Sequence, residues 1–396
     1  MKQNYILALI LVLDIGVLLF ETSTLSLSYT EAHTYFGYYG VVGYLSHIFS
    51  GLFGQNDYMV RLPFILLHTA SAFLLYKISR HFLKTYRERN ILIVVFLLLP
   101  GVMSSALLVN KVGVVIFLAF LFVYLYFTCK NLYLLYGFMV FLAFVDNSFG
   151  YLFLAIFFFA LQEKNKQLAA LSVLLVALNL FLYGTDIGGY PTGHFLDALG
   201  IYSAIFSPVV FVYIVYILYR HFLSKEKNIL WYIATVPLLF SLLLSLRQRV
   251  HIEYYAPFVL LALLLAARQF VSSYRVRLPG FRKRYKLLFN ISLFFLVLHF
   301  GIIVTNKFLY TLLDTPKRHF AYKNHIAKEL AHNLRKNNIT CIKTDYKMQL
   351  RLEFYGIGEC EEYRLEYFQP LDGIDVTVRY SNTPVYLAYV TKINNQ

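Results

Sequence analysis

Charged side chains are scarce in this 396-residue sequence. Asp, Glu, Lys and Arg make up 14% of the residues, whereas soluble globular proteins carry about 25%. Hydrophobic residues make up 59%, and uncharged stretches such as 91–109 and 229–246 approach the roughly 20 apolar residues that a helix needs to cross a membrane. The sequence therefore predicts an integral membrane protein whose main partner is the lipid bilayer.

Cysteine is also scarce. Three cysteines exclude a disulfide-rich scaffold and a zinc site of clustered thiolates. No His-x-x-x-His or equivalent spacing places His33 or His251 in a metal site. The sequence therefore indicates no cofactor, and a divalent metal ion stays an open alternative.

The net charge is +15, but Lys and Arg lie in short loops between apolar runs rather than on one basic face. This distribution argues against a nucleic-acid partner.

Eleven apolar stretches predict an all-α membrane bundle of about eleven transmembrane helices. Lys2 and the run 5–20 resemble a secretory signal peptide, but ten further spans follow, so we expect an uncleaved first helix. Residues 28–61 are predicted as an outer loop, and the short spans 132–145 and 149–161 could instead form one broken helix. The spans are expected near residues 5–27, 62–79, 91–109, 112–128, 132–145, 149–161, 168–184, 203–219, 229–246, 252–270 and 287–305.

Lys and Arg are distributed unevenly among the loops between these spans. Loops on one side carry 19 of them, whereas loops on the other side carry only Arg61, Lys111, Arg247 and Arg249. Basic loops stay on the cytoplasmic side of a membrane. The distribution therefore predicts a cytoplasmic N-terminus and a C-terminal tail on the outer side.

One ionisable side chain lies inside the first predicted span. Asp14 would be costly there without partners, and Glu21, seven residues further on, falls on the same helix face. We expect a buried structural role for Asp14.

Residues 306–396 are predicted to form a small α/β or α+β domain outside the membrane, after a membrane domain over 1–305. Ile326, Leu330 and Leu334 share one face of the first predicted helix. Because the outer compartment is oxidising, a disulfide between Cys341 and Cys360 is expected. The predicted elements are an amphipathic helix over 319–336, a short helix near 350–355 and strands over 363–368, 376–380 and 385–390.

Two sequence motifs lie near the two ends of the segment between the first two spans. Residues 30–35 read Thr-Glu-Ala-His-Thr-Tyr, and residues 52–63 begin with Leu-Phe-Gly and end with Arg-Leu-Pro. They resemble the GT-C glycosyltransferases, within them the protein O-mannosyltransferase and lipid A aminoarabinose transferase group, in which Asp-Glu-Ala-x-Tyr follows the first helix. Thr30 stands where the family has Asp, and the loop is shorter and lacks the usual Pro-Pro. These departures bear on catalysis more than on fold.

Two later positions extend the resemblance over roughly residues 5–305. Residues 247–258 look like the family's late outer phrase, in which a basic residue and Tyr precede a Pro that opens a helix. Asn110 aligns with a second family acid at the start of the fourth helix, but Asn cannot act as a base at neutral pH.

The resemblance implies a GT-C-like glycosyltransferase in the inner membrane of a bacterium. It would transfer a sugar from a polyprenyl-phosphate donor to a lipid, glycan or protein acceptor at the outer face, with inversion at the anomeric carbon. A carboxylate would orient and deprotonate the acceptor hydroxyl, and cations would bind the lipid phosphate. The candidates are Glu31 as the base, Arg247 and Arg249 as phosphate binders, and Tyr35, Arg61 and Asn110 as further substrate-binding residues.

Each candidate has a simpler alternative. Glu31 could lie solvated in a loop or cap a juxtamembrane helix, and Arg61 could form a helix-entry ion pair with Asp57, four residues away. Arg247 and Arg249 could anchor the chain to lipid headgroups. For the whole chain, the alternatives are a glycolipid transporter or flippase, and a noncatalytic relative that acts as a membrane scaffold.

The uneven distribution of Lys and Arg generates a prediction about topology. A reporter enzyme that is active only outside the cytoplasm should work when it is fused after Gln396 and fail when it is fused near Arg284, because basic loops are retained inside. Reporter activity on cells measures both fusions. The reverse pattern would overturn the orientation.

Overall fold

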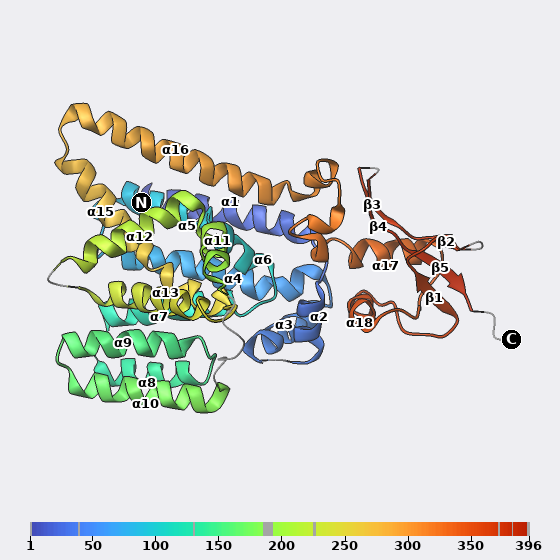
Figure 1. Cartoon of the computed structure of the whole chain (residues 1–396), viewed down its shortest axis with the longest axis horizontal. Coiled ribbons are helices and arrows are strands. Elements are labelled where there is room, and N and C mark those ends of the chain that lie inside the picture. Colours follow the sequence, from blue (N-terminus) through green and yellow to red (C-terminus); the bar gives the residue numbers. More distant parts are fainter. Residues whose placement is uncertain are drawn as a thin grey trace. The chain divides into compact units, whose positions relative to one another are not determined.

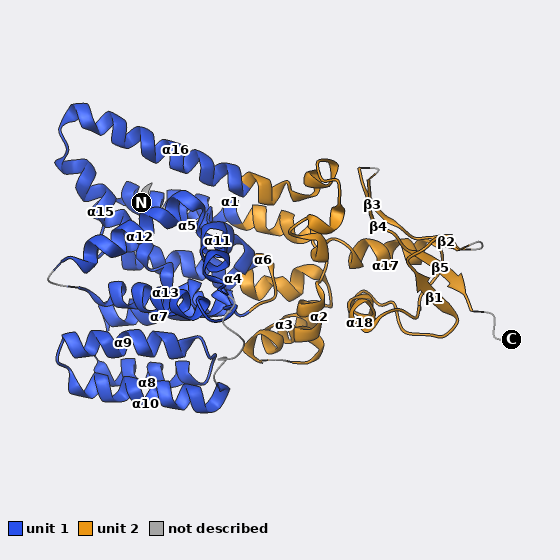
Figure 2. Cartoon of the chain, in the orientation of Figure 1, with its two compact units in different colours: residues 1–14, 66–106, 111–300 blue, residues 15–65, 107–110, 301–396 orange. Residues whose placement is uncertain are grey.

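The structure is a computed structural model that describes residues 2–38, 40–129, 131–184, 193–224, 227–370, 373–381 and 383–393. Within these residues the chain forms 18 α-helices and, near its C-terminus, five short β-strands (Figure 1). The elements belong to two compact units (Figure 2). Unit 1 comprises residues 1–14, 66–106 and 111–300, and unit 2 comprises residues 15–65, 107–110 and 301–396. The expected tail domain thus lies in unit 2, together with two segments from earlier in the chain.

Unit 1 is a bundle of helices around one apolar core. Helix α9 packs on α10 and on α13, and Phe120, Phe153 and Phe258 are among its fully buried side chains. The helices that lie in unit 1 wholly or in part are α1 (Lys2–Thr24), α4 (Asp57–Ser79), α5 (Tyr86–Leu97), α6 (Pro100–Leu107), α7 (Val112–Thr128), α8 (Leu132–Ala143), α9 (Phe149–Gln162), α10 (Lys166–Tyr183), α11 (Phe195–Phe206), α12 (Pro208–Phe222), α13 (Ile229–Ser245), η1 (Ile252–Tyr254), α14 (Ala256–Val259), α15 (Ala262–Val276) and α16 (Pro279–Val304).

Several helices have the length and composition of membrane spans. Five described helices pass this test alone, and the number rises to seven if the bent pairs α5–α6 and α11–α12 each form one span. The chain is therefore an integral membrane protein. The expected count of eleven crossings is not established, because α7, α8, α9 and α13 are apolar but only 12 to 17 residues long.

The break between α11 and α12 has a local cause. The two helices meet at an angle of 107°, and the residue between them, Ser207, has a φ of 64°. Pro208, which follows, disfavours a helical conformation at the preceding residue. The expected single span over 203–219 is therefore two helices in the structure.

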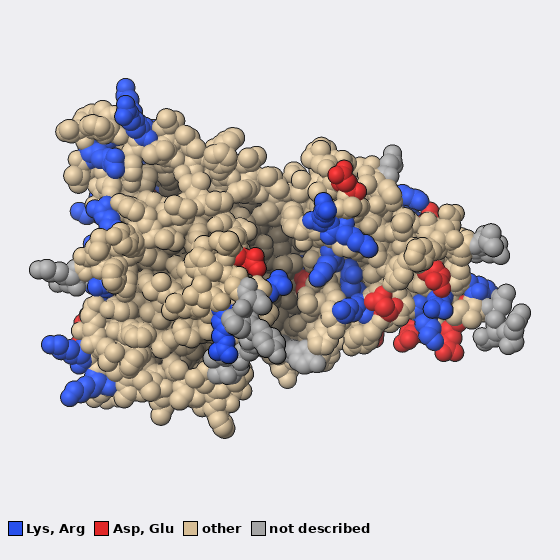
Figure 3. Space-filling view, viewed as in Figure 1, with Lys and Arg blue, Asp and Glu red and all other residues tan. Residues whose placement is uncertain are grey.

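Charge is concentrated at one end of unit 1. Figure 3 shows Lys and Arg gathered at the end where α15 leads into α16, while the flanks of the helices on this face carry hardly any charge. Inside the bundle, His68 Nε2 lies 2.9 Å from Asp14 Oδ2, and both side chains are buried. The Asp14 side chain is thus buried and paired, as expected for an ionisable residue inside a span, and its structural role stays a prediction.

Unit 2 combines short helices with two small sheets. Strand β5 pairs with β1 and with β2, and β3 pairs with β4, all antiparallel. Leu330, Leu352 and Val390 are buried in its tail core. Besides the ends of α1, α4 and α16, its elements are α2 (Tyr29–Phe36), α3 (Gly40–Phe53), η2 (Asn306–Thr311), η3 (Pro316–Arg318), η4 (Tyr322–Asn324), α17 (Ala327–Lys336), α18 (Tyr346–Phe354), β1 (Tyr363–Glu366), β2 (Ile374–Asp375), β3 (Val378–Tyr380), β4 (Thr383–Tyr386) and β5 (Tyr389–Lys392).

The structure corrects several expected elements of unit 2. Residues 28–61, expected as an outer loop between the first two spans, contain the helices α2 and α3. The helix expected over 319–336 begins only at Ala327, since turns and a 3-10 segment precede it, although Ile326, Leu330 and Leu334 are buried as expected. The strand expected over 385–390 is wrong, because those residues are divided between β4 and β5.

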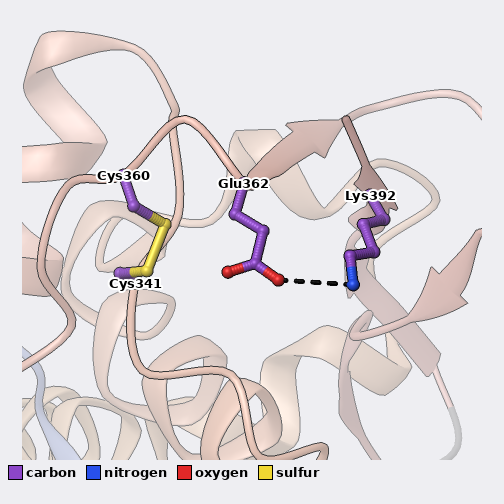
Figure 4. The surroundings of a disulfide bond; sticks show 4 residues. All are labelled: Cys341, Cys360, Glu362 and Lys392. Carbon is purple, nitrogen blue, oxygen red and sulfur yellow. Dashed lines mark ion pairs between the residues drawn. A yellow bond between two sulfur atoms is a disulfide. The ribbon is translucent and has the colours of Figure 1, made fainter. Parts of the chain in front are cut away.

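Cys341 and Cys360 form a disulfide in the tail (Figure 4). Their Cα atoms are 5.5 Å apart, and 19 residues separate them in sequence. The bond ties the segment before α18 to the segment before β1, beside an ion pair between Lys392 and Glu362 at 3.4 Å. The third cysteine, Cys129, is free.

The disulfide generates a prediction. Alkylated protein should differ in mass with and without prior reduction, and replacing both Cys341 and Cys360 by Ser should lower the free energy of unfolding of unit 2 by about 3 kcal/mol, because a loop of this length loses that much closure entropy when it is cross-linked. Mass spectrometry and denaturant unfolding measure the two effects. Cys129→Ser is the matched control and should change neither. Equal masses would exclude the bond.

Candidate functional site

Glu31, the candidate base, sits in the first turn of α2. The side chain of Ser28 caps this helix: Glu31 N–H donates to Ser28 Oγ at 3.4 Å, and Ser28 N–H donates to Glu31 Oε2 at 2.8 Å. This reciprocal pair is a capping box, which satisfies two backbone donors at the start of a helix. Glu31 therefore caps a helix directly after α1, one of the two simpler alternatives that the sequence leaves open.

The Glu31 carboxylate also accepts hydrogen bonds from three other segments of unit 2. Its Oε1 accepts from Val109 N–H at 3.0 Å and lies 3.5 Å from Arg61 Nη2. Its Oε2 accepts from Asn324 Nδ2 at 2.8 Å, in addition to Ser28. With only 2% of the residue exposed, this carboxylate joins α2 to α4, to residues 107–110 and to η4.

Arg61 is fully buried between two carboxylates. Its Nη1 lies 3.3 Å from Asp57 Oδ1, one helical turn away, and its Nη2 donates to the Ser26 carbonyl at 3.1 Å. A buried guanidinium requires opposite charge and hydrogen-bond acceptors. The helix-entry pair with Asp57 is therefore present, but Arg61 also pairs with Glu31, to which the spacing alone does not point.

Residues of the tail complete the arrangement. Lys328 Nζ lies 3.1 Å from Asp57 Oδ2. Tyr355 Oη donates to Asp57 Oδ1 at 2.7 Å and accepts from Leu27 N–H at 2.9 Å. Burial, together with the Asp57 charge, raises the pKa of Tyr355 well above its ordinary value, so this hydroxyl keeps its proton. We refer to Glu31, Asp57, Arg61, Lys328 and Tyr355 as the Glu31 cluster; its two carboxylates balance two cations.

Arg351 supports the cluster from α18. Its Nε donates to the Leu27 carbonyl at 3.0 Å, and its Nη2 donates to the Lys323 carbonyl at 2.7 Å. Burial lowers the pKa of Arg351. The guanidinium fixes the backbone on both sides of the cluster, the turn before α2 and the turn before α17.

Two further candidates lie in the same unit. Tyr35 is buried; its Oη lies 2.9 Å from Ser50 Oγ, and its ring stacks on His47 at a centroid distance of 4.1 Å. It therefore packs α2 against α3. Asn110 belongs to the short segment that presents Val109 N–H to Glu31. Thr30, at the position of the family's Asp, is exposed.

Arg247 and Arg249 belong to unit 1, in the turn between α13 and η1. Both side chains are exposed, and among the described residues neither forms an ion pair within 4 Å. Lys111, in contrast, lies 3.2 Å from Asp146 and 3.6 Å from the centroid of the Tyr254 ring. An exposed Arg without a carboxylate partner can bind a phosphate, whereas the charge of Lys111 is already neutralised.

Buried histidines in the tail are held neutral. His319 Nε2 donates to the Asn306 carbonyl at 2.8 Å while its Nδ1 accepts from Ala321 N–H. Burial lowers the pKa of His325 to about 3, and its Nδ1 lies 3.0 Å from Tyr310 Oη. A general base is most effective when its pKa is near the operating pH, so such a low pKa makes His325 a poor base at neutral pH.

No metal site is evident. Within the ranges that the structure describes, no group of three or more His, Cys, Asp or Glu side chains could hold a metal ion. His251 and Glu253 approach only to 4.0 Å and are both largely exposed.

The sequence carried no signal for four tail residues that complete the polar arrangement around Glu31 and Asp57. Asn324, Lys328, Arg351 and Tyr355 lie about 300 positions after Glu31, in a segment that reads as an independent domain. A buried Arg such as Arg351, which follows Leu350 on a short amphipathic helix, looks like an ordinary exposed cation in the sequence. Only the fold brings Asn324 to Glu31 and brings Lys328 and Tyr355 to Asp57. It likewise brings Arg351 to the Leu27 carbonyl.

No model of a known protein family matches the chain, and no curated protein matches its sequence. The chemistry of the site is therefore inferred from the geometry of the Glu31 cluster and from the residue types that it contains.

The position of Tyr355 generates a prediction about stability. Tyr355→Phe should lower the free energy of unfolding of unit 2 by about 1–3 kcal/mol, because Leu27 N–H and Asp57 each lose a buried hydrogen bond. Tyr346→Phe, at the start of the helix that Tyr355 follows, is the matched control, since Tyr346 is 66% exposed. Thermal or denaturant unfolding of the purified protein compares the two variants. Equal stability would show that the Tyr355 hydroxyl contributes nothing to the cluster.

Proposed function

We propose that this protein is a membrane glycosyltransferase that moves a sugar from a polyprenyl-phosphate donor to an acceptor at the outer face of the membrane. The Glu31 cluster carries the proposal. It places two buried carboxylates and a buried guanidinium, with the partly exposed Lys328, directly after a candidate span, in the segment that resembles the GT-C transferases. Charged groups gathered in this way often mark functional sites.

The proposed reaction assigns a role to each residue type. The acceptor oxygen attacks the anomeric carbon, the bond from that carbon to the phosphate oxygen breaks, and the polyprenyl phosphate leaves with the electron pair. Glu31 takes the proton of the acceptor hydroxyl. Arg247 and Arg249 bind the phosphate with charge-assisted hydrogen bonds. For this role, Glu31 Oε2 exchanges one of its donors, Ser28 or Asn324, for the acceptor hydroxyl.

The proposed topology has eleven crossings, with the N-terminus in the cytoplasm and the tail outside, in the inner membrane of a bacterium. The five long helices, the two bent pairs and the four shorter apolar helices α7, α8, α9 and α13 add up to that number. The disulfide between Cys341 and Cys360 supports an outer position for the tail, because disulfides persist in oxidising compartments.

One observation favours a second candidate function, a noncatalytic relative that acts as a membrane scaffold. Both oxygens of Glu31 already accept hydrogen bonds. An exposed threonine, Thr30, stands where the family has a carboxylate. In this alternative Glu31 is only a structural junction.

The experiment measures sugar transfer by the purified protein in lipid vesicles, with a panel of radiolabelled polyprenyl-phosphate sugars and a membrane extract as the source of acceptors. Glu31→Gln should reduce transfer by about 10²–10⁴-fold, because the general base is lost. Binding of a polyprenyl phosphate should persist in that variant. Exchanging both Arg247 and Arg249 for Gln should weaken donor binding instead.

Controls separate catalysis from folding. Glu31→Gln also removes a partner of a buried cation, which can cost about 3–5 kcal/mol, so the folded fraction is measured for each variant. Asn324→Ala is the matched variant: it removes one hydrogen bond from Glu31 but keeps the carboxylate, and it should retain transfer. No transfer by the wild-type protein from any donor in the panel would favour the scaffold, and normal transfer by Glu31→Gln would exclude Glu31 as the base.

A further inference from the structure

We infer that α3 lies along the surface of the lipid bilayer, with one face inserted at the boundary between headgroups and acyl chains. The partner of this face is thus a lipid surface. The inference rests on the membrane character of the chain and not on the proposed catalytic activity.

The first observation is an exposed apolar stripe on α3. Val41, Tyr44, Ile48 and Leu52 follow one another at intervals of three or four residues, and they are 39%, 60%, 55% and 70% exposed. This spacing places them on one face of the helix. Phe53, at the end of α3, is another exposed apolar residue, with 62% of its surface accessible. Contiguous apolar faces of this kind are rare on surfaces that contact only water.

The second observation is that the polar side chains of α3 face inward. Ser46 and Ser50 are buried, and Ser50 Oγ lies 2.9 Å from Tyr35 Oη of α2. His47 Nε2 lies 2.7 Å from the Tyr35 carbonyl. The face toward the protein is therefore the polar one. This inverts the usual pattern of a surface helix, whose apolar side faces the core.

Gly43 shows how closely the inner face packs. A Cβ atom at this position would lie 2.8 Å from the Thr34 carbonyl oxygen, which is too close for any other residue without movement of the backbone. The inner face of α3 is therefore in tight contact with α2 and the turn after it, so the apolar stripe cannot simply rotate inward.

The position and packing of α3 identify lipid as the partner. Within unit 2, α3 lies in the chain between the end of α1 at Thr24 and the start of α4 at Asp57, and both of these helices are candidate spans. Its 14 residues contain no charged side chain, and its inner face packs on α2, which follows the end of α1. A helix that is held beside the ends of two spans and exposes an apolar face lies in the interface.

Helix α3 is linked to the Glu31 cluster through α2. Tyr35 and Tyr38 both stack on His47, at centroid distances of 4.1 Å and 3.8 Å, so α2 is held rigidly on α3. If α3 lies in the interface, it fixes the depth of Glu31, one turn before Tyr35. The cluster would then lie at the bilayer surface, where a lipid-borne group and a water-borne group can meet.

The test uses spin labels on single cysteines in a Cys129→Ser background that keeps the native disulfide. Labels are placed at Val41, Ile48 and Leu52, and at His332 on α17 as an exposed control. The protein is reconstituted in vesicles of phosphatidylethanolamine and phosphatidylglycerol, and collisions with oxygen and with a water-soluble nickel chelate are compared. The α3 labels should favour oxygen and report a depth of about 5–10 Å, whereas the label at His332 should favour the nickel chelate.

Two results would overturn the inference. Nickel-accessible labels on α3 would place the stripe in water, and labels protected from both reagents would show a protein partner over it. If a labelled variant does not fold, Ile48→Trp in a Trp231→Phe background replaces it, with His332→Trp as its control. Brominated lipids should quench the fluorescence of the first variant and not of the second; unquenched Ile48→Trp would reject the lipid contact.

Discussion

The burial of Arg61 is the constraint on which unit 2 depends. A guanidinium that is fully removed from water is tolerated only when opposite charges and hydrogen-bond acceptors surround it. Glu31, Asp57 and the Ser26 carbonyl meet this requirement. Each of the two carboxylates is then completed by a residue of the tail, Asn324 for Glu31 and Lys328 for Asp57. The cation thus determines where distant segments meet.

This polar junction explains why the tail and the segment after α1 form one compact unit. Hydrophobic burial is non-directional, so it would allow the tail to pack in several orientations. Arg351 Nε donates to the Leu27 carbonyl, and Leu27 N–H donates to Tyr355 Oη; these hydrogen bonds have defined directions and fix one orientation. The cost of leaving any of these buried groups unpaired penalises the alternatives.

Local and distant features of the site differ in how far the sequence predicts them. The Asp57–Arg61 pair follows from a spacing of four residues, and a helix cap involving Glu31 was expected from Thr30 beside it, although the structure uses Ser28 as the capping residue. Both features are properties of a single helix. The contacts of Asn324 and Tyr355 depend on the tertiary fold, on which a single sequence carries no periodic signal. Helix α3 was missed for a different reason. Glycine and polar residues interrupt the apolar ones throughout its 14 residues, so the stretch shows no continuous apolar run.

The hydrogen bonds to the Glu31 carboxylate affect both of its proposed roles, the general base and the structural junction. A carboxylate with four hydrogen-bond donors and a nearby guanidinium is held in one position, which a transferase needs for an oriented base, but the donors also compete with the acceptor hydroxyl. Of these donors, Val109 N–H and Ser28 N–H belong to the backbone and cannot leave without disturbing a segment or a helix cap. Asn324 is a side chain in a short 3-10 turn, and it is only partly buried. If Glu31 acts on an acceptor, the position that Asn324 occupies is therefore the one at which the hydroxyl enters with the least cost to the fold.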